Sequence, residues 1–185
     1  MTEPSATSCP VLALVTGLPG SGKSTVAGDA ADLLNASLLS HDWAMSGLRP
    51  YPAVQAALDG MTPPGHGPVG WSVLGTLARA ELRRGRSVVL DGVARMAEIE
   101  RCHQSARAEG SRLVVILVEC PDLDIHRSRI ETRRRDIPGW YELTWDDVQR
   151  SRSRWSPPPH SDLHIDSTAT RDSIRERIGS LLGSD

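Results

Sequence analysis

The stretch that decides the fold is Gly17-Leu18-Pro19-Gly20-Ser21-Gly22-Lys23-Ser24-Thr25, written GLPGSGKST. It contains the only lysine of the chain, since the other 20 of the 21 Lys and Arg residues are arginine. Residues 17–24 satisfy the pattern G-x-x-x-x-G-K-[ST], which binds phosphates where it joins a strand to a helix. Lysine suits the space between β- and γ-phosphates because it is a compact point charge, and the hydroxyl of Ser24 is a ligand for Mg²⁺. The motif predicts a nucleoside triphosphate site built from Gly17, Gly20, Ser21, Gly22, Lys23, Ser24 and Thr25.

The sequence on both sides of this motif alternates between strand and helix patterns. Val11–Thr16 is a short apolar run typical of a buried strand, and Ser24–Leu34 has a helical pattern. Further strands are predicted at 36–40, 87–90, 112–118 and 163–166, and further helices at 71–84, 97–108, 121–135, 144–155 and 171–182. Apolar strands that alternate with helices predict a parallel sheet covered on both faces. We expect one α/β domain over residues 1–185, arranged as a three-layer α/β/α sandwich.

Residues 49–70 interrupt this alternation. The segment is rich in proline and glycine, most densely at 63–68. This composition predicts an irregular insertion on the surface.

The overall composition is that of an ordinary globular chain. The formal net charge is −2 and the pI about 6.3, so no general affinity for nucleic acid or anionic membranes is indicated. The first ten residues lack the basic and apolar regions of a secretory leader, and no apolar run approaches the roughly 18 residues of a membrane span. We therefore expect a cytoplasmic protein whose three cysteines, Cys9, Cys102 and Cys120, are free thiols.

Two aspartates follow predicted strands, at the sheet edge where ligands of such folds bind. Asp91 ends the run Val88-Val89-Leu90, which favours a magnesium role over the alternative of a helix cap or turn residue. Asp42 follows the second strand and is our candidate for the base that orients a substrate hydroxyl, with a helix cap as the alternative. The adjacent His41 is a weaker candidate for the same role, and we interpret it as structural.

An arginine cluster lies on the helix predicted at 121–135 and just beyond it, at Arg127, Arg129, Arg133, Arg134 and Arg135. Arg129 and Arg133 are four residues apart and so share one helix face, from which both can reach the phosphates. The alternative is a solvated helix face, which carries more weight for Arg134 and Arg135 than for Arg129 and Arg133. Residues 136–140 then form the tip of a mobile lid that excludes water from the transferring phosphate.

The tryptophans leave two interpretations open. Trp43 and Trp71 flank the 49–70 segment, where they either line an acceptor pocket or pack in the core, and we favour the core for both. Trp140, Trp145 and Trp155 are expected to pack the lid and the helix behind it. For the nucleotide, the chain lacks the N/T-K-x-D motif that reads guanine, which favours ATP over GTP.

With GLPGSGKST, the HDW after the second strand, LDG, R-x-x-x-R at 129–133 and the SRSRWSPPP tail, the chain resembles P-loop kinases grouped around polynucleotide kinase and chloramphenicol phosphotransferase. The resemblance runs from about residue 11 to residue 166. It implies a five-stranded parallel sheet of order 2-3-1-4-5 with a helical lid at 127–142. It also implies that Asp42 is the base, that Arg129 and Arg133 are the lid arginines, that Asp91 is the Walker B-like aspartate, and that 49–70 is an acceptor-side segment.

One departure from the pattern concerns the substrate. Members that act on nucleic acid carry Thr-Asn after the aspartate, whereas this chain has Gly92-Val93-Ala94-Arg95. The resemblance therefore favours a small molecule, which Arg95 would touch.

Our hypothesis is an ATP- and Mg²⁺-dependent kinase that phosphorylates a hydroxyl of a small molecule such as an antibiotic, nucleoside or sugar. The alternatives are a 5′-hydroxyl polynucleotide kinase and a non-catalytic, ATP-dependent regulatory protein that uses the 49–70 segment to bind a partner. The sequence names neither the acceptor nor the oligomeric state.

Overall fold

The computed structural model describes residues 9–183. The N-terminal segment on which the expectation of a leaderless protein depends therefore lies mostly outside the described residues. No helix within residues 9–183 is long and apolar enough to cross a membrane.

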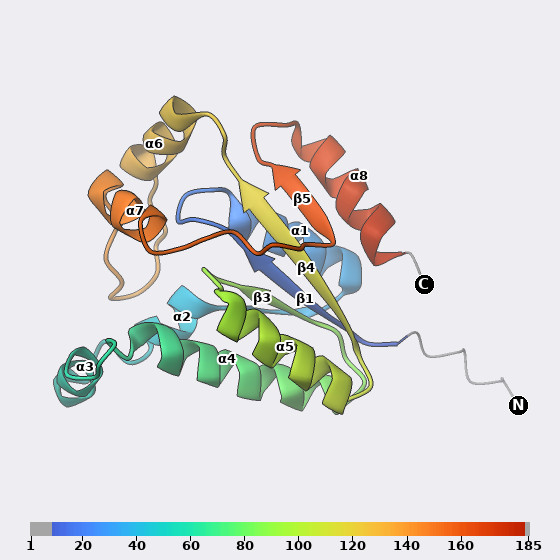
Figure 1. Ribbon diagram of the computed structural model, residues 1–185, viewed down its shortest axis with the longest axis horizontal. Coiled ribbons are helices and arrows are strands. Elements are labelled where there is room, and N and C mark those ends of the chain that lie inside the picture. The colour runs from blue at the N-terminus through green and yellow to red at the C-terminus, as the bar shows by residue number, and fades with distance from the viewer. Residues whose placement is uncertain (1–8, 184–185) are drawn as a thin grey trace, which may run out of the picture.

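The fold is a five-stranded parallel sheet of order β2-β3-β1-β4-β5 with helices on both faces (Figure 1). The predicted three-layer sandwich and its strand order are confirmed. In chain order the elements are β1 (Val11–Thr16), α1 (Lys23–Leu34), β2 (Ser37–Ser40), α2 (His41–Ser46), α3 (Pro52–Asp59), α4 (His66–Leu82), β3 (Val88–Asp91), α5 (Met96–Ala108), β4 (Arg112–Glu119), α6 (Leu123–Thr132), α7 (Trp145–Arg152), β5 (Leu163–Asp166) and α8 (Arg171–Leu182).

The central strand β1 supplies side chains to two separate apolar layers. Successive side chains of a strand point to opposite faces. Val11, Ala13 and Val15 pack with helices α1 and α8, whereas Leu12 and Leu14 pack with α4 and α5. Burial on both faces explains why β1 is apolar from Val11 to Val15 instead of alternating with polar residues.

The segment 49–70 is only partly irregular, which corrects the sequence-based expectation: residues 60–65 form no helix or strand, but helices lie on both sides of them. It contains all of α3 and the first turn of α4. Pro52 occupies the first turn of α3, where its missing N–H costs nothing, and good helix formers follow it. Gly70 within α4 permits a close helix contact, because a Cβ there would lie 2.4 Å from Nε2 of His41. Proline and glycine at these positions serve helix start and packing, not helix breaking.

Other elements also differ from those predicted. Strand β2 continues directly into the short helix α2, which was not predicted. Helix α6 ends at Thr132, and Arg133 already has extended backbone angles. Helix α7 begins after Thr144 as predicted, with Thr144 as its N-cap, but ends at Arg152.

Candidate active site

The loop between β1 and α1 has the shape that phosphate binding requires. Gly17 has φ +149° and passes so close to β4 that a Cβ would lie 2.1 Å from the carbonyl oxygen of Val118. Gly22 has φ +97° and directly precedes the first residue of α1. Side chains at these two positions would clash or be strained, so only glycine lets the loop wrap in front of the helix N-terminus.

Lys23 is the first residue of α1 and is buried, with 8% of its surface exposed. Its ammonium group donates a hydrogen bond to the carbonyl oxygen of Leu18, 3.0 Å away, across the loop. Burial lowers the pKa of Lys23 below its ordinary value, and the carboxylates of Asp91 and Asp42 act against that shift. Lys23 therefore interacts electrostatically with both aspartates singled out in the sequence.

The sheet register brings these groups to one edge. Asp91, the last residue of β3, is opposite Ser40 of β2 on one side and Val15 of β1 on the other. Ser40 directly precedes α2, so Asp42 lies in the first turn of that helix at the same edge. The structure thus brings the loop, Asp42 and Asp91 together, as the sequence predicted.

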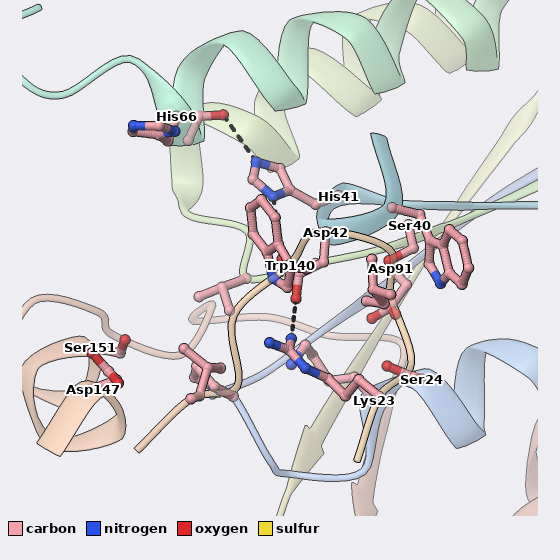
Figure 2. A pocket seen from close by; sticks show the side chains of 18 of the residues that line it. Lys23, Ser24, Ser40, His41, Asp42, His66, Asp91, Trp140, Asp147 and Ser151 are labelled. Atoms are coloured by element: carbon pink, nitrogen blue, oxygen red, sulfur yellow. Dashed lines mark hydrogen bonds and ion pairs between the residues drawn. The ribbon is translucent and has the colours of Figure 1, made fainter. Parts of the chain in front are cut away.

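These residues line one cavity of about 630 Å³. Lys23, Ser24 and Asp91 lie on one side, and Asp147 and Ser151 of α7 lie on the other, as Figure 2 shows. The cavity also receives residues from α2, from the start of α4, from the loop after β3 and from the segment that follows α6.

Asp42 is held between a histidine and an arginine. Its Oδ2 accepts a hydrogen bond from Nη1 of Arg135 at 2.5 Å, and its Oδ1 lies 3.6 Å from Nδ1 of His41 (Figure 2). The other ring nitrogen of His41 is 3.3 Å from the carbonyl oxygen of Gly67. Burial raises the pKa of Asp42, but His41, Arg135 and Lys23 together outweigh burial and hold that pKa below its usual value. Asp42 is therefore a carboxylate at neutral pH and can accept a hydrogen bond from a hydroxyl.

The predicted lid arginines separate in the structure. Arg133 lines the cavity, but the guanidinium of Arg129 donates to the hydroxyl and the carbonyl oxygen of Ser167, at 2.7 and 2.8 Å. Arg129 does not line the cavity, although one of its nitrogens lies 3.8 Å from the place of a Cβ at Gly22. The two do not share a helix face, because the helix ends before Arg133.

Arg135, which was not among the predicted lid arginines, is the arginine that contacts Asp42. Its side chain is 6% exposed, and besides Asp42 it contacts Glu142 and the carbonyl oxygen of Tyr141. The available signal was the Asp-Ile-Pro-Gly run at 136–139, which indicates that the helix has ended. Beyond the helix end, Arg133 and Arg135 both line the cavity, whereas Arg129 within the helix does not.

The tryptophans divide between core and cavity. Trp71 is buried in the core against Leu74 and Leu90, as favoured, although its edge also lines the cavity. The core interpretation is wrong for Trp43, which is 55% exposed and lines the cavity. Trp140 stacks on Tyr141 and lines the cavity with it.

The loop after β3 meets the segment after α7 at one hydrogen bond. The indole N–H of Trp155 donates to the carbonyl oxygen of Ala94 at 2.7 Å, while the amide of Ala94 donates to Thr16 at 2.9 Å. Arg95 and Arg154 are the neighbours of these two bonded residues, and both line the cavity. Arg154 was not singled out in the sequence.

The described residues do not form a metal cage of their own. Within residues 9–183, no group of three or more His, Cys, Asp or Glu side chains could hold a metal ion. Ser24 and Asp91 nevertheless present two oxygen donors to the cavity beside the phosphate-binding loop. This donor set fits Mg²⁺, which usually takes one or two protein oxygens and completes its shell with phosphate and water.

Comparison with known proteins identifies the family. The sequence profile of the AAA domain family, AAA_33, matches residues 12–158. No curated protein matches the chain.

Among solved structures, several kinases have a similar fold. The structure of APS kinase from Mycobacterium tuberculosis in complex with AMPPNP and APS is 20% identical, covers 95% of this chain and 98% of its own, and gives a TM-score of 0.66. A gluconokinase from Sinorhizobium meliloti is 16% identical, covers 94% of this chain and 91% of its own, and gives a TM-score of 0.65. Shikimate kinase from Bacteroides thetaiotaomicron is 17% identical, covers 96% of this chain and 100% of its own, and gives a TM-score of 0.64. At such identities the likeness concerns the fold.

The family match covers most of the chain, from the central strand through the phosphate-binding loop to the segment after α7. The protein therefore belongs to the AAA_33 family of AAA domains.

Proposed function

We propose that the protein is a kinase that transfers the γ-phosphoryl group of Mg-ATP to a hydroxyl group of a small molecule. The observation that carries the proposal is the carboxylate of Asp42, which lies in the same cavity as the P-loop lysine and interacts with it electrostatically. A protein that only bound nucleotide would not require a carboxylate in this cavity besides the predicted magnesium ligand Asp91. A kinase requires one, to orient the attacking hydroxyl.

In this reaction a bond forms between the acceptor oxygen and the γ-phosphorus, and the bond from that phosphorus to the β–γ bridging oxygen breaks, releasing ADP. Asp42 accepts the hydroxyl proton. Lys23, the N-terminus of α1 and Arg133 offset the phosphate charge, and Mg²⁺, held by Ser24 and Asp91, would neutralise more of it.

The ion pair between Arg135 and Asp42 links the predicted lid, residues 127–142, to the proposed base. Asp42 is engaged by Arg135 through one carboxylate oxygen, Oδ2. For a hydroxyl to take that oxygen as acceptor, the arginine must release it, and a γ-phosphate nearby offers an alternative anionic partner. Arg129, bonded to Ser167 beside the P-loop, is assigned to the nucleotide side of the site.

Two comparisons support this choice of reaction. The three neighbours named above are kinases for small molecules by name, and they match this chain over nearly its full length. The narrower resemblance to the chloramphenicol phosphotransferase group rests on the short motifs in the sequence. The residues after Asp91, Gly92-Val93-Ala94-Arg95, favour a small molecule over the polynucleotide of the alternative hypothesis.

The proposal is tested by ADP release from Mg-ATP with hydroxyl compounds added singly: antibiotics, nucleosides, sugars, hydroxy acids and a 5′-hydroxyl oligonucleotide. We expect one small-molecule class to raise ADP release above the water background, with phosphate recovered on the compound. ATP binding without transfer to any compound, together with a partner protein that changes hydrolysis, would support the regulatory alternative instead.

The role of Asp42 is tested by Asp42→Asn. Loss of a proton acceptor is expected to lower kcat by about 10²–10⁴-fold with little change in the KM for ATP. Because Asp42→Asn also removes an ion pair with Arg135, Glu142→Gln serves as the control: it removes the other carboxylate partner of Arg135 but no proton acceptor in the cavity. Similar losses in both variants would assign Asp42 to lid anchoring alone.

A further inference from the structure

We propose that the acceptor carries an oxyanion group, a carboxylate or a phosphate, in addition to its reactive hydroxyl, and that Arg95 and Arg154 bind this group. The inference builds on the proposed kinase function and adds the substrate class. It depends on charges in the cavity wall that the phosphate-transfer machinery does not use.

The two arginines come from distant parts of the chain but line the same cavity. Arg95 directly precedes α5, and Arg154 lies two residues beyond α7. The indole N–H of Trp155, the residue after Arg154, donates a hydrogen bond to the backbone carbonyl oxygen of Ala94, the residue before Arg95. Both side chains are exposed and both line the cavity.

Most other arginines of the cavity already have partners. Arg135 is paired with Asp42 and Glu142, and Arg150 with Asp147. Arg49 donates to Gly139 and Gln55.

Within residues 9–183, by contrast, neither Arg95 nor Arg154 forms an ion pair with a carboxylate. The carboxylate closest in sequence to Arg95 is Glu98, which is taken by the guanidinium of Arg101 at 2.7 Å and by the backbone amide of Arg95 at 2.9 Å. Two guanidinium groups on the wall thus lack a counter-ion, and an oxyanion is the ligand whose geometry a guanidinium matches.

The nucleotide does not account for this positive charge. In the proposed reaction its phosphates bind the P-loop, Lys23 at the N-terminus of α1, and Arg133. These groups belong to elements other than those that carry Arg95 and Arg154. Arg95 on the loop after β3 and Arg154 on the segment after α7 are therefore available to bind the acceptor.

The aromatic side chains that line the cavity indicate what the rest of the acceptor is like. Trp43 and Tyr141 line it with 55% and 50% of their surfaces exposed, and Trp140 stacks on Tyr141. Exposed aromatic faces favour a ligand with an apolar or planar body. The predicted acceptor is a compact hydroxyl compound with such a body and one anionic group.

The kinetic test compares each anionic acceptor with a neutral form that keeps the same hydroxyl: a hydroxy acid with its methyl ester, and a phosphomonoester with its parent alcohol. The two pairs distinguish a carboxylate from a phosphate. Wild-type protein is expected to favour the anion by about tenfold or more in kcat/KM, the size of one charge-assisted hydrogen bond. Equal kcat/KM for the anionic and neutral forms would overturn the proposal while leaving the kinase function standing.

The variant Arg95→Gln/Arg154→Gln is compared with the matched control Arg107→Gln/Arg152→Gln, which removes two exposed arginines from α5 and α7 that do not line the cavity. We expect the first pair to raise the KM for the anionic acceptor by about tenfold to a hundredfold, with kcat and the KM for ATP nearly unchanged. The control pair should leave all three values unchanged. A loss shared by both pairs would assign the effect to net charge and overturn the site.

A binding measurement separates this proposal from the kinase function. With Mg-AMPPNP saturating the P-loop, inorganic phosphate is titrated calorimetrically into wild-type protein and both double variants. Binding that weakens about tenfold only in Arg95→Gln/Arg154→Gln supports the anion site even if no compound is phosphorylated. Equal phosphate affinity in all three proteins overturns it. The proposal is also overturned if a 5′-hydroxyl oligonucleotide is the best acceptor and depends on the pair, because the arginines would then belong to a nucleic-acid site.

Discussion

Lys23 illustrates how much a single residue decides. Every other basic residue of the chain is arginine, yet here a lysine is buried with its ammonium group against the carbonyl oxygen of Leu18. A planar guanidinium needs more room and a forked partner, neither of which this buried position offers.

We therefore expect Lys23→Arg to keep the positive charge but to lose nearly as much turnover as Lys23→Ala, about 10²-fold or more. Steady-state ADP release measures the loss, and Arg134→Lys, an exchange at an exposed position of the lid, serves as the control. Lys23→Arg with more than half of wild-type turnover would mean that charge alone suffices.

At the same scale, the P-loop and the two aspartates could be predicted because each is tied to a strand end that the apolar pattern reveals. Arg135 could not, because its role depends on where α6 stops and on a contact with Asp42, 93 residues away in the chain. Within an arginine cluster the sequence does not distinguish one guanidinium from the next.

At the scale of elements, His126 of α6 contacts both the P-loop and α7. It lies in α6 with 1% of its surface exposed, Nε2 donates to the carbonyl oxygen of Pro19 in the P-loop at 2.7 Å, and its ring packs edge-on against Trp145 of α7. Its other nitrogen, Nδ1, is buried without a hydrogen-bond partner among the described residues. Burial lowers the pKa of His126, and the charges of Arg152, Lys23 and Arg129 add to that effect.

This lowered pKa predicts a dependence of stability on pH. As the pH falls through about 6.5, the unfolded chain binds a proton that the folded protein does not, so the free energy of unfolding falls. We expect His126→Gln, which keeps an N–H donor for Pro19, to show a smaller loss of stability than wild type between about pH 7.5 and 5.5. Urea denaturation across this range measures the slope. His103→Gln, at an exposed position of α5, should keep the wild-type slope; a His126→Gln slope equal to wild type would contradict the assignment.

The segment after α6 is the other element whose behaviour follows from few contacts. Arg135 ties it down through Asp42, Glu142 and the carbonyl oxygen of Tyr141, whereas the adjacent Arg134 is exposed. We expect Arg135→Gln to speed chymotrypsin cleavage at Trp140 and Tyr141 by about tenfold, since local opening of a lid costs little once its anchor is lost. Mass spectrometry of the fragments measures the rate. Arg134→Gln should cleave like wild type, and unchanged cleavage in Arg135→Gln would mean that other contacts hold the segment.

The elements also show where composition misleads. Glycine and proline in 49–70 indicate a loop, but a proline in a first helical turn and a glycine packed against His41 are compatible with helices α3 and α4. Long apolar elements such as β1 and β4 could be predicted, because burial on both faces leaves an unbroken apolar run. The short helix α2 could not, because it has neither an apolar period nor a side-chain cap.

For the whole molecule, the strand order is the one that the family resemblance implies, helices connect the parallel strands on both faces, and the two apolar layers meet at β1. The P-loop leaves this central strand, and so its geometry depends on the intact sheet. A nucleotide that binds only the folded form should therefore stabilise the entire domain.

We expect Mg-AMPPNP at about 100 times its Kd to raise the Tm by roughly 5–10 °C, corresponding to about 2.7 kcal/mol. Differential scanning fluorimetry measures the shift. Lys23→Ala should abolish the shift, whereas Asp42→Asn should retain it because the proposed partner of Asp42 is the acceptor hydroxyl and not the nucleotide. An equal shift in wild type and Lys23→Ala would show that the analogue binds elsewhere.

The single buried lysine has a practical consequence. A protease that cuts only after lysine has one cleavage site in this chain, and that site lies inside the P-loop at the start of α1. Such a protease reports on the opening of one loop with no background from the remaining 184 residues. The time course of one cut would then follow nucleotide occupancy in unlabelled, full-length protein.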